Sequence, residues 1–116
     1  MSLNRLSENE LVAFKLLFLK NELDLDWFLF LCNQEKFMVL ERERTKTGFF
    51  ITIKKNLNFI KLENYIEYNF RYFLDDKTYI GSFMLWVNET ALDFECVFFN
   101  DFVPNKFIFE NFSEIE

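Results

Sequence analysis

Residues 79–99 read YIGSFMLWVNETALDFECVFF. In the strand before the polar turn at 88–90, Phe83, Leu85 and Val87 lie on one face. Ser82, Met84 and Trp86 lie on the other face. After the turn, Leu92, Phe94, Cys96 and Phe98 oppose Asp93 and Glu95. Alternation on both sides of a short turn predicts an antiparallel hairpin with one face in the core and one facing outward.

An earlier pair of β-rich runs, 37–44 and 49–55, predicts a second hairpin. Gly48 is expected to supply a positive φ or a bulge in the link. Strict alternation puts Glu41 and Glu43 on the face of Phe37 and Val39, and puts Arg42 and Arg44 on the opposite face with Met38 and Leu40. The arginine pair could bind an anion or a partner's carboxylates, or it could pair across strands on a protective edge.

The clearest helix signal lies at the N-terminus. Ser7 and Glu10 have the spacing of a capping box, and Leu6 and Leu11 have that of a hydrophobic staple. An apolar stripe with helical spacing follows and ends near Lys20, which predicts a helix over about 7–20. Residues 23–32 read either as a second short helix, which we favour, or as a buried strand.

The remaining segments complete the predicted fold. Residues 70–74 are expected to form a strand that ends at Asp75-Asp76-Lys77, residues 106–110 an edge strand, and residues 113–116 a frayed tail. Helix first and hairpins afterwards predict one α+β domain over 1–116, with the N-terminal helix packed on a mostly antiparallel sheet.

Composition and charge exclude several functions. The chain has no His, no phosphate-binding glycine motif and no nucleophile motif, so we expect no catalytic residues, no cofactor and no metal site. Residues 1–58 carry nine basic and eight acidic side chains, whereas residues 59–116 carry four and eleven. This acidic second half disfavours nucleic acid and favours a basic protein partner, although acidity also serves solubility.

The two cysteines and the N-terminal sequence indicate in which cellular compartment the protein is expected. Cys32 and Cys96 lie within apolar runs and read as small buried hydrophobes rather than a redox or zinc motif. No signal sequence is evident, and charged residues interrupt the apolar stretch at 11–32. We therefore expect a cytoplasmic protein without a membrane-spanning segment.

Two groups stand out among the eighteen Phe residues. Six lie on predicted core faces: Phe14, Phe18, Phe37, Phe49, Phe83 and Phe94. The cluster from Phe98 to Phe112 exceeds what the strand pattern can bury, so it could line a partner interface or an apolar cavity, or simply enlarge the core. The alternative function is the binding of an apolar small molecule in a Phe-lined cavity.

The segment Arg42-Glu43-Arg44-Thr45-Lys46-Thr47-Gly48-Phe49-Phe50 resembles the hairpin signature of a family of small bacterial proteins. Gly81–Val87 and Leu92–Glu95 are similar to later strands of that family. Many of its members are immunity partners of contact-dependent or polymorphic toxins. The resemblance implies a non-enzymatic protein that binds a toxin domain, often a basic nuclease, and covers its active site.

In that reading, carboxylates of the acidic half imitate phosphates and aromatic side chains anchor the contact. The candidate partner-binding residues are Glu63, Glu67, Asp75, Asp76, Asp93, Glu95, Asp101 and Phe102. The partner's identity and the oligomeric state, monomer or homodimer, stay open.

Overall fold

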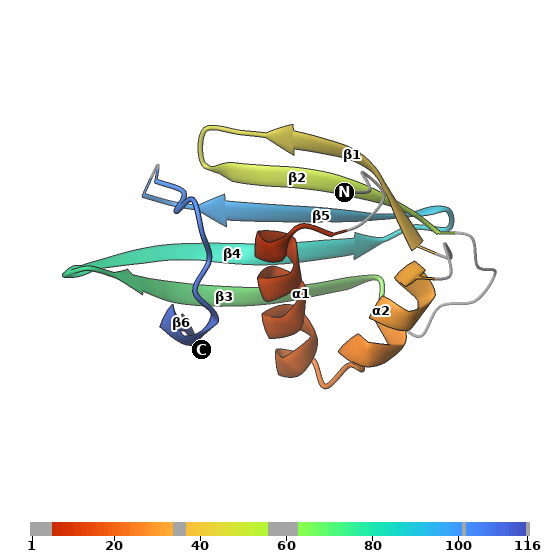
Figure 1. The fold of residues 1–116 in the computed structure, drawn as a ribbon, viewed down its shortest axis with the longest axis horizontal. Helices are drawn as coiled ribbons and strands as arrows, with labels where there is room; N and C mark the ends of the chain where they lie inside the picture. Colours follow the sequence, from red (N-terminus) through yellow and green to blue (C-terminus); the bar gives the residue numbers. More distant parts are fainter. Residues whose placement is uncertain (1–5, 34–36, 56–62, 101, 116) are drawn as a thin grey trace.

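The computed structural model describes residues 6–33, 37–55, 63–100 and 102–115. Two helices precede the sheet: α1, Glu8–Lys20, and α2, Leu25–Asn33. The strands are β1, Phe37–Arg44; β2, Gly48–Lys55; β3, Tyr65–Leu74; β4, Lys77–Val87; β5, Ala91–Phe98; and β6, Phe112–Glu114. Each strand pairs antiparallel with its neighbours, in the order β1-β2-β5-β4-β3-β6 (Figure 1). The predicted α+β class is confirmed.

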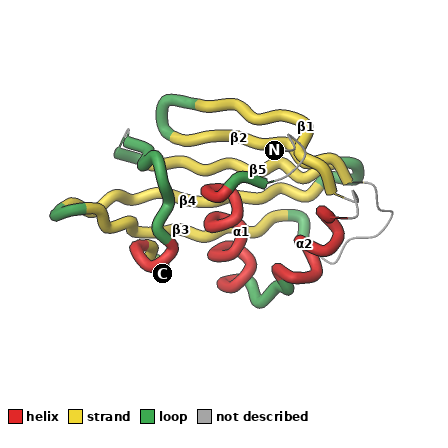
Figure 2. Tube along the Cα trace, in the orientation of Figure 1, coloured by secondary structure: helices red, strands yellow, loops and turns green. Residues whose placement is uncertain are grey.

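The helix α1 begins where the capping signal predicts. The Ser7 side chain accepts a hydrogen bond from the Glu10 amide, and the Glu10 carboxylate accepts one from the Ser7 amide at 2.8 Å. The segment at 23–32 is helical rather than extended, and Asp24 accepts a hydrogen bond from the Trp27 amide at its start. Both helices lie on one face of the sheet (Figure 2).

The core fills the space between this helical layer and the sheet. Phe14 of α1 stacks on Phe28 of α2 and on Phe94 of the central strand β5, with ring centroids 5.2 and 4.7 Å apart. All three rings are fully buried. Packed aromatic pairs at these spacings stabilise the fold beyond the area that they bury.

Three expectations are wrong, each because of a contact between distant parts of the chain. Gly48 has no positive φ and lies inside β2. A Cβ there would collide with the Cys96 carbonyl oxygen and lie 2.7 Å from its carbon, so glycine is needed for the close approach of β5. The predicted strand at 106–110 is an irregular segment followed by a 3-10 helix, Phe109–Asn111. The predicted frayed tail instead pairs with β3 as β6, and the Ile115 amide donates to the Asn69 carbonyl.

Residues 102–111, which we call the strap, cross the helical side of the sheet between β5 and β6 (Figure 1). The Asn9 amide group bonds the backbone of Asn105 and Phe107, and the Tyr72 hydroxyl bonds the backbone of Lys106 and Ile108. These side chains occupy the backbone groups that a strand would need, which explains why no strand forms there. The strap also buries Phe107, so part of the late Phe cluster belongs to the core.

Candidate functional site

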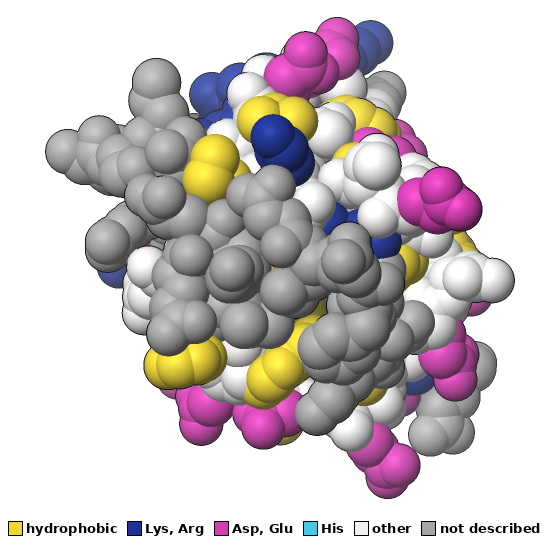
Figure 3. Space-filling model, turned by 90° about the vertical axis from the view of Figure 1, so that its right-hand side faces the viewer, with side chains coloured by type: hydrophobic (Ala, Val, Ile, Leu, Met, Phe, Trp, Pro, Cys, Tyr) yellow, Lys and Arg dark blue, Asp and Glu magenta, His cyan; other side chains and the backbone are white. Residues whose placement is uncertain are grey.

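The sheet face opposite the helices carries the densest set of exposed acidic and aromatic side chains. We call it the outer face. Its residues include Met38, Glu41, Glu43, Phe50, Thr52, Lys54, Tyr65, Glu67, Asn69, Arg71, Phe73, Thr78, Ile80, Ser82, Met84, Trp86, Ala91, Asp93, Glu95 and Val97. Seen from the end that carries α2, several Asp and Glu side chains project on the side away from the helices (Figure 3). The outer face holds five carboxylates and two cations, a net charge of −3.

Strand pairing arranges this face in rows that run across five strands. One row is Glu43, Phe50, Glu95, Met84 and Glu67, in the order β1, β2, β5, β4, β3. The adjacent row is Glu41, Thr52, Asp93, Trp86 and Tyr65. We call these two the acidic rows. Neighbours in a row lie about 5 Å apart, so the rows form one continuous acidic and aromatic surface.

The structure brings together only some of the predicted partner-binding residues. Glu67, Asp93 and Glu95 share the acidic rows. Asp75 and Asp76 lie in the turn after β3, with Asp75 at φ 55°, and Glu63 lies exposed just before β3. Phe102 stacks on Tyr79 at 4.7 Å, away from the rows, and Asp101 lies outside the described residues.

Sequence reasoning missed two carboxylates, Glu41 and Glu43, which come from the nearly neutral half of the chain. They join the acidic rows because β1 pairs with β2, and β2 with β5. The register shifts between Val39 and Glu41. This bulge turns Glu41 and Glu43 outward and turns Arg42 and Arg44 toward the helices, which corrects the strict alternation expected for β1.

Three of the five carboxylates have no partner among the described residues. Asp93 accepts hydrogen bonds from Thr52 at 3.3 Å and Asn88 at 2.8 Å, and Glu67 accepts one from Asn69 at 3.1 Å. Glu41, Glu43 and Glu95 make no hydrogen bond or ion pair within the described part of the chain. A cationic partner can therefore approach these three without displacing an existing contact.

Polar and aromatic neighbours complete the outer face. Trp86 and Tyr65 are 36% and 38% exposed, and their rings lie 5.4 Å apart. Desolvation, with the nearby Glu67 charge, raises the pKa of Tyr65, so its phenol stays neutral at physiological pH. Beside the acidic rows lies Ser82, 4% exposed, whose hydroxyl has no hydrogen-bond partner among the described residues.

An anion site is one of the alternatives for the arginine pair, and one of the two, Arg42, is committed within the fold. Arg42 binds the buried Glu10 carboxylate through Nε at 2.7 Å and Nη2 at 3.0 Å, and this hydrogen bonding raises the arginine pKa. A hollow of about 260 Å³ beside them is lined by two Arg and two Glu, together with Ser7, Asn9, Phe49 and Ile51. Glu10 already neutralises Arg42 there, and the Glu43 side chain faces the other side of β1, so Arg44 is the one cation lining the hollow that has no ion pair among the described residues.

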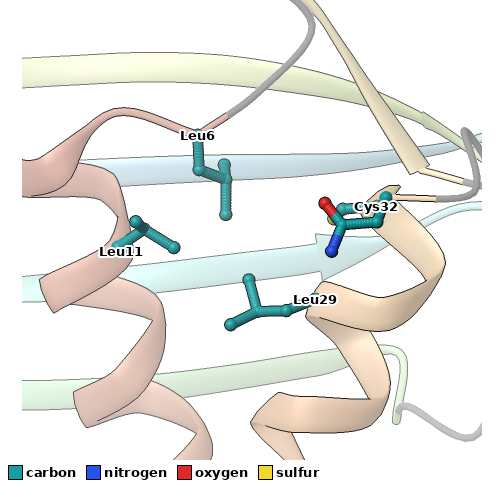
Figure 4. A pocket seen from close by; sticks show the side chains of 5 residues that line it. Leu6, Leu11, Leu29 and Cys32 are labelled. Atoms are coloured by element: carbon teal, nitrogen blue, oxygen red, sulfur yellow. The ribbon is translucent and has the colours of Figure 1, made fainter.

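A second hollow, of about 320 Å³, lies between α1 and α2. Leu6, Leu11 and Leu29 point toward one another in it, with Cys32 and Asn33 at the α2 side (Figure 4). The sequence predicts that Phe side chains line such a cavity, but among the described residues leucines line this one. Desolvation raises the pKa of Cys32 to about 12, so the thiol stays protonated and weakly nucleophilic near neutral pH.

No group of three or more His, Cys, Asp or Glu side chains lies within reach of a common metal ion in 6–33, 37–55, 63–100 and 102–115. No helix in those ranges is both long enough and apolar enough to cross a bilayer.

Comparison with known proteins yields no match to a family model, a curated protein or a solved structure. The resemblance to immunity proteins therefore stays a prediction, and the outer face has to be interpreted from its own chemistry.

Proposed function

We propose that this chain is a non-enzymatic protein-binding module whose outer face binds a basic protein domain. The observation that carries the proposal is the run of the acidic rows across five strands, with three carboxylates that are unpaired within the part of the chain that the structure describes. Exposed Trp86 and Tyr65 lie among these charges. Aromatic anchors surrounded by charges are typical of protein interfaces.

The charge of the outer face argues against two other occupants. A phosphate backbone would meet a surface of its own sign. A second copy docked face to face would oppose one net charge of −3 to another.

Pairing of the β1 edge with the same edge of a second copy is also unfavourable. Across two antiparallel strands, paired residues lie on the same sheet face. A two-fold pairing of β1 with itself would therefore set Glu41 or Glu43 against Glu, and Arg42 or Arg44 against Arg. The charges of β1 protect this edge.

The resemblance noted in the sequence makes the proposal more specific. An immunity protein inhibits a toxin stoichiometrically by covering its active site, and a nuclease toxin has a basic cleft for phosphates. Carboxylates spaced along strands can occupy such a cleft as phosphate mimics. We therefore propose that the partner is a basic toxin domain, and that binding takes place in the cytoplasm of the producing cell.

The test begins with the neighbouring genes: if one of them encodes a toxin-like domain, its direct binding to this chain is measured with the recombinant domain. We expect one-to-one inhibition, an affinity that falls steeply as salt increases, and at least a tenfold loss of affinity in Glu95→Lys. Glu110→Lys is the matched control, because it changes the same charge on an exposed residue of the strap. Equal losses in both variants, or affinity independent of salt, would reject the outer face as the binding site.

A second candidate function, binding of an apolar small molecule, is favoured by the hollow lined with Leu6, Leu11 and Leu29. Its volume of about 320 Å³ lies at the small end for ligand pockets. Leu29→Phe should fill it. Loss of binding of a fluorescent fatty-acid analogue in this variant, with toxin binding unchanged, would assign the ligand to this hollow.

A further inference from the structure

The outer face changes character along the strands. Beyond Ser82 it carries three large exposed apolar side chains: Phe73 is 45% exposed, Ile80 43% and Phe99 63%. Two exposed polar residues lie among them, Arg71 opposite Ile80 and Thr78 opposite Phe73. Phe99 is the first turn residue after β5, and its amide donates to the Ile80 carbonyl at 2.7 Å, which holds Phe99 beside Ile80. The Ile80 amide donates to the Asn100 side chain, so the pairing of β5 with β4 ends there. Phe73 lies on β3 next to the β4 residues, since it pairs with Thr78. We call these three residues the apolar end.

The apolar end and the acidic rows belong to one surface. Met84, in an acidic row, and Ile80 both lie on β4 and face the same side, four residues apart. At about 3.3 Å per residue they are separated by ~13 Å. A single partner element can span that distance, and large exposed apolar side chains beside a charged surface mark an interaction site.

The surface also restricts what kind of element can dock. The central strands have both edges paired within the sheet, so this face offers side chains and no free ladder of backbone groups. A segment lying on it must satisfy its own backbone hydrogen bonds. A helix does so, and helices already cover the opposite face of this sheet.

We infer that the occupant of the outer face is a basic amphipathic helix of the partner. Its cationic side chains lie over the acidic rows, and its apolar side chains lie over Phe73, Ile80 and Phe99. This inference rests on the proposed function and adds the form of the partner's contact. The two regions have separate effects: the carboxylates speed association, and the apolar end slows dissociation.

The chain contains its own reporter for a test. Its two Trp residues are Trp27, on α2, and Trp86, in an acidic row. In Trp27→Phe, fluorescence comes from Trp86 alone. The probes are an 18-residue helical peptide of Leu on one face and Lys on the other, and an oligolysine of equal charge. Binding is followed by stopped flow at low and moderate salt.

We expect the Leu-Lys peptide to shift Trp86 emission and to bind at least tenfold more tightly than oligolysine. Phe99→Ser and Ile80→Thr should each raise its dissociation rate about tenfold and leave oligolysine unaffected. Glu95→Lys should weaken both probes. Leu19→Ser is the control, because Leu19 is 59% exposed on α1, on the other side of the sheet, and its loss should leave both affinities within twofold.

The outcomes separate the two proposals. If Phe99→Ser and Ile80→Thr behave like Leu19→Ser while Glu95→Lys still weakens binding, the amphipathic helix is rejected and the acidic site stands. If Glu95→Lys has no effect on either probe, the acidic site fails as well. If Trp86 emission depends on protein concentration without peptide, and light scattering gives a dimer, a second copy covers the face and the inference is overturned.

Discussion

Arg42 of β1 and Glu10 of α1 form a two-point ion pair, with Nε 2.7 Å from Oε2 and Nη2 3.0 Å from Oε1. The same carboxylate accepts the Ser7 amide and closes the helix cap. Glu10 is only 4% exposed, so one buried carboxylate holds both the start of the helix and the first strand. Bidentate pairing of this kind is among the stronger polar contacts in proteins.

Arg42→Met should destabilise the fold, because it leaves the Glu10 carboxylate buried without its cation. We expect the free energy of unfolding to fall by about 2 kcal/mol, below the range for fully buried pairs because the arginine is partly exposed. Urea denaturation measures the change. Arg44→Met is the matched control, since Arg44 lies on the same face with no ion pair among the described residues. Equal losses would show that the pair contributes little.

Gly48→Ala should destabilise the sheet through a collision of the new Cβ with the Cys96 carbonyl, a backbone group that cannot rotate away. We expect a loss of at least about 2 kcal/mol, the range of strain and overpacking effects. Thermal and urea denaturation both report it. Thr47→Ala, one residue earlier, should cost less than about 0.5 kcal/mol. A Gly48→Ala variant as stable as wild type would contradict the close packing of β2 and β5.

Tyr72→Phe should loosen the strap, because the fully buried Tyr72 hydroxyl bonds the backbone of Lys106 and Ile108. The expected cost is about 1–2 kcal/mol, and the Ile108 amide should exchange with deuterium at least tenfold faster. Tyr79→Phe is the control, because that hydroxyl has no hydrogen bond within the described part of the chain. Unchanged exchange at Ile108 in Tyr72→Phe would contradict this role.

The protein should lose stability as the pH rises above about 9. Desolvation raises the pKa of Cys32 from 9.0 to about 12, and that of Cys96 well above 9.0. At a pH between the unfolded and the folded pKa of a thiol, the unfolded chain releases a proton that the folded chain retains, so rising pH favours unfolding. Each thiol contributes at most about 1.4 kcal/mol per pH unit, and partly exposed Cys32 contributes less.

Urea denaturation under reducing conditions at pH 8, 9 and 10 measures that slope. Cys32→Ala removes one thiol from the edge of a hollow and should flatten the decline. Cys32→Ser is the polar control, and its stability should decline with pH as slowly as that of Cys32→Ala. An identical decline in the wild type and both variants would mean that the Cys32 thiol titrates normally in the fold.

Much of the fold follows from local sequence. The Ser7 and Glu10 spacing predicts the cap, and alternation predicts the hairpin of β4 and β5 with Asp93 and Glu95 facing outward. These features depend on residues that are close in the chain. The chain also indicates, by its excess of carboxylates, that a basic partner is favoured.

Only the tertiary structure decided where the carboxylates meet. Strand order places β5 between β2 and β4, so Glu43, Glu95 and Glu67 come into one row although they are far apart in the chain. The bulge after Val39 sends Arg42 toward Glu10 and the neighbouring glutamates outward. Side-chain alternation repeats every two residues, so a one-residue shift reverses every later side chain, and pairing between distant strands, not local pattern, fixes that shift.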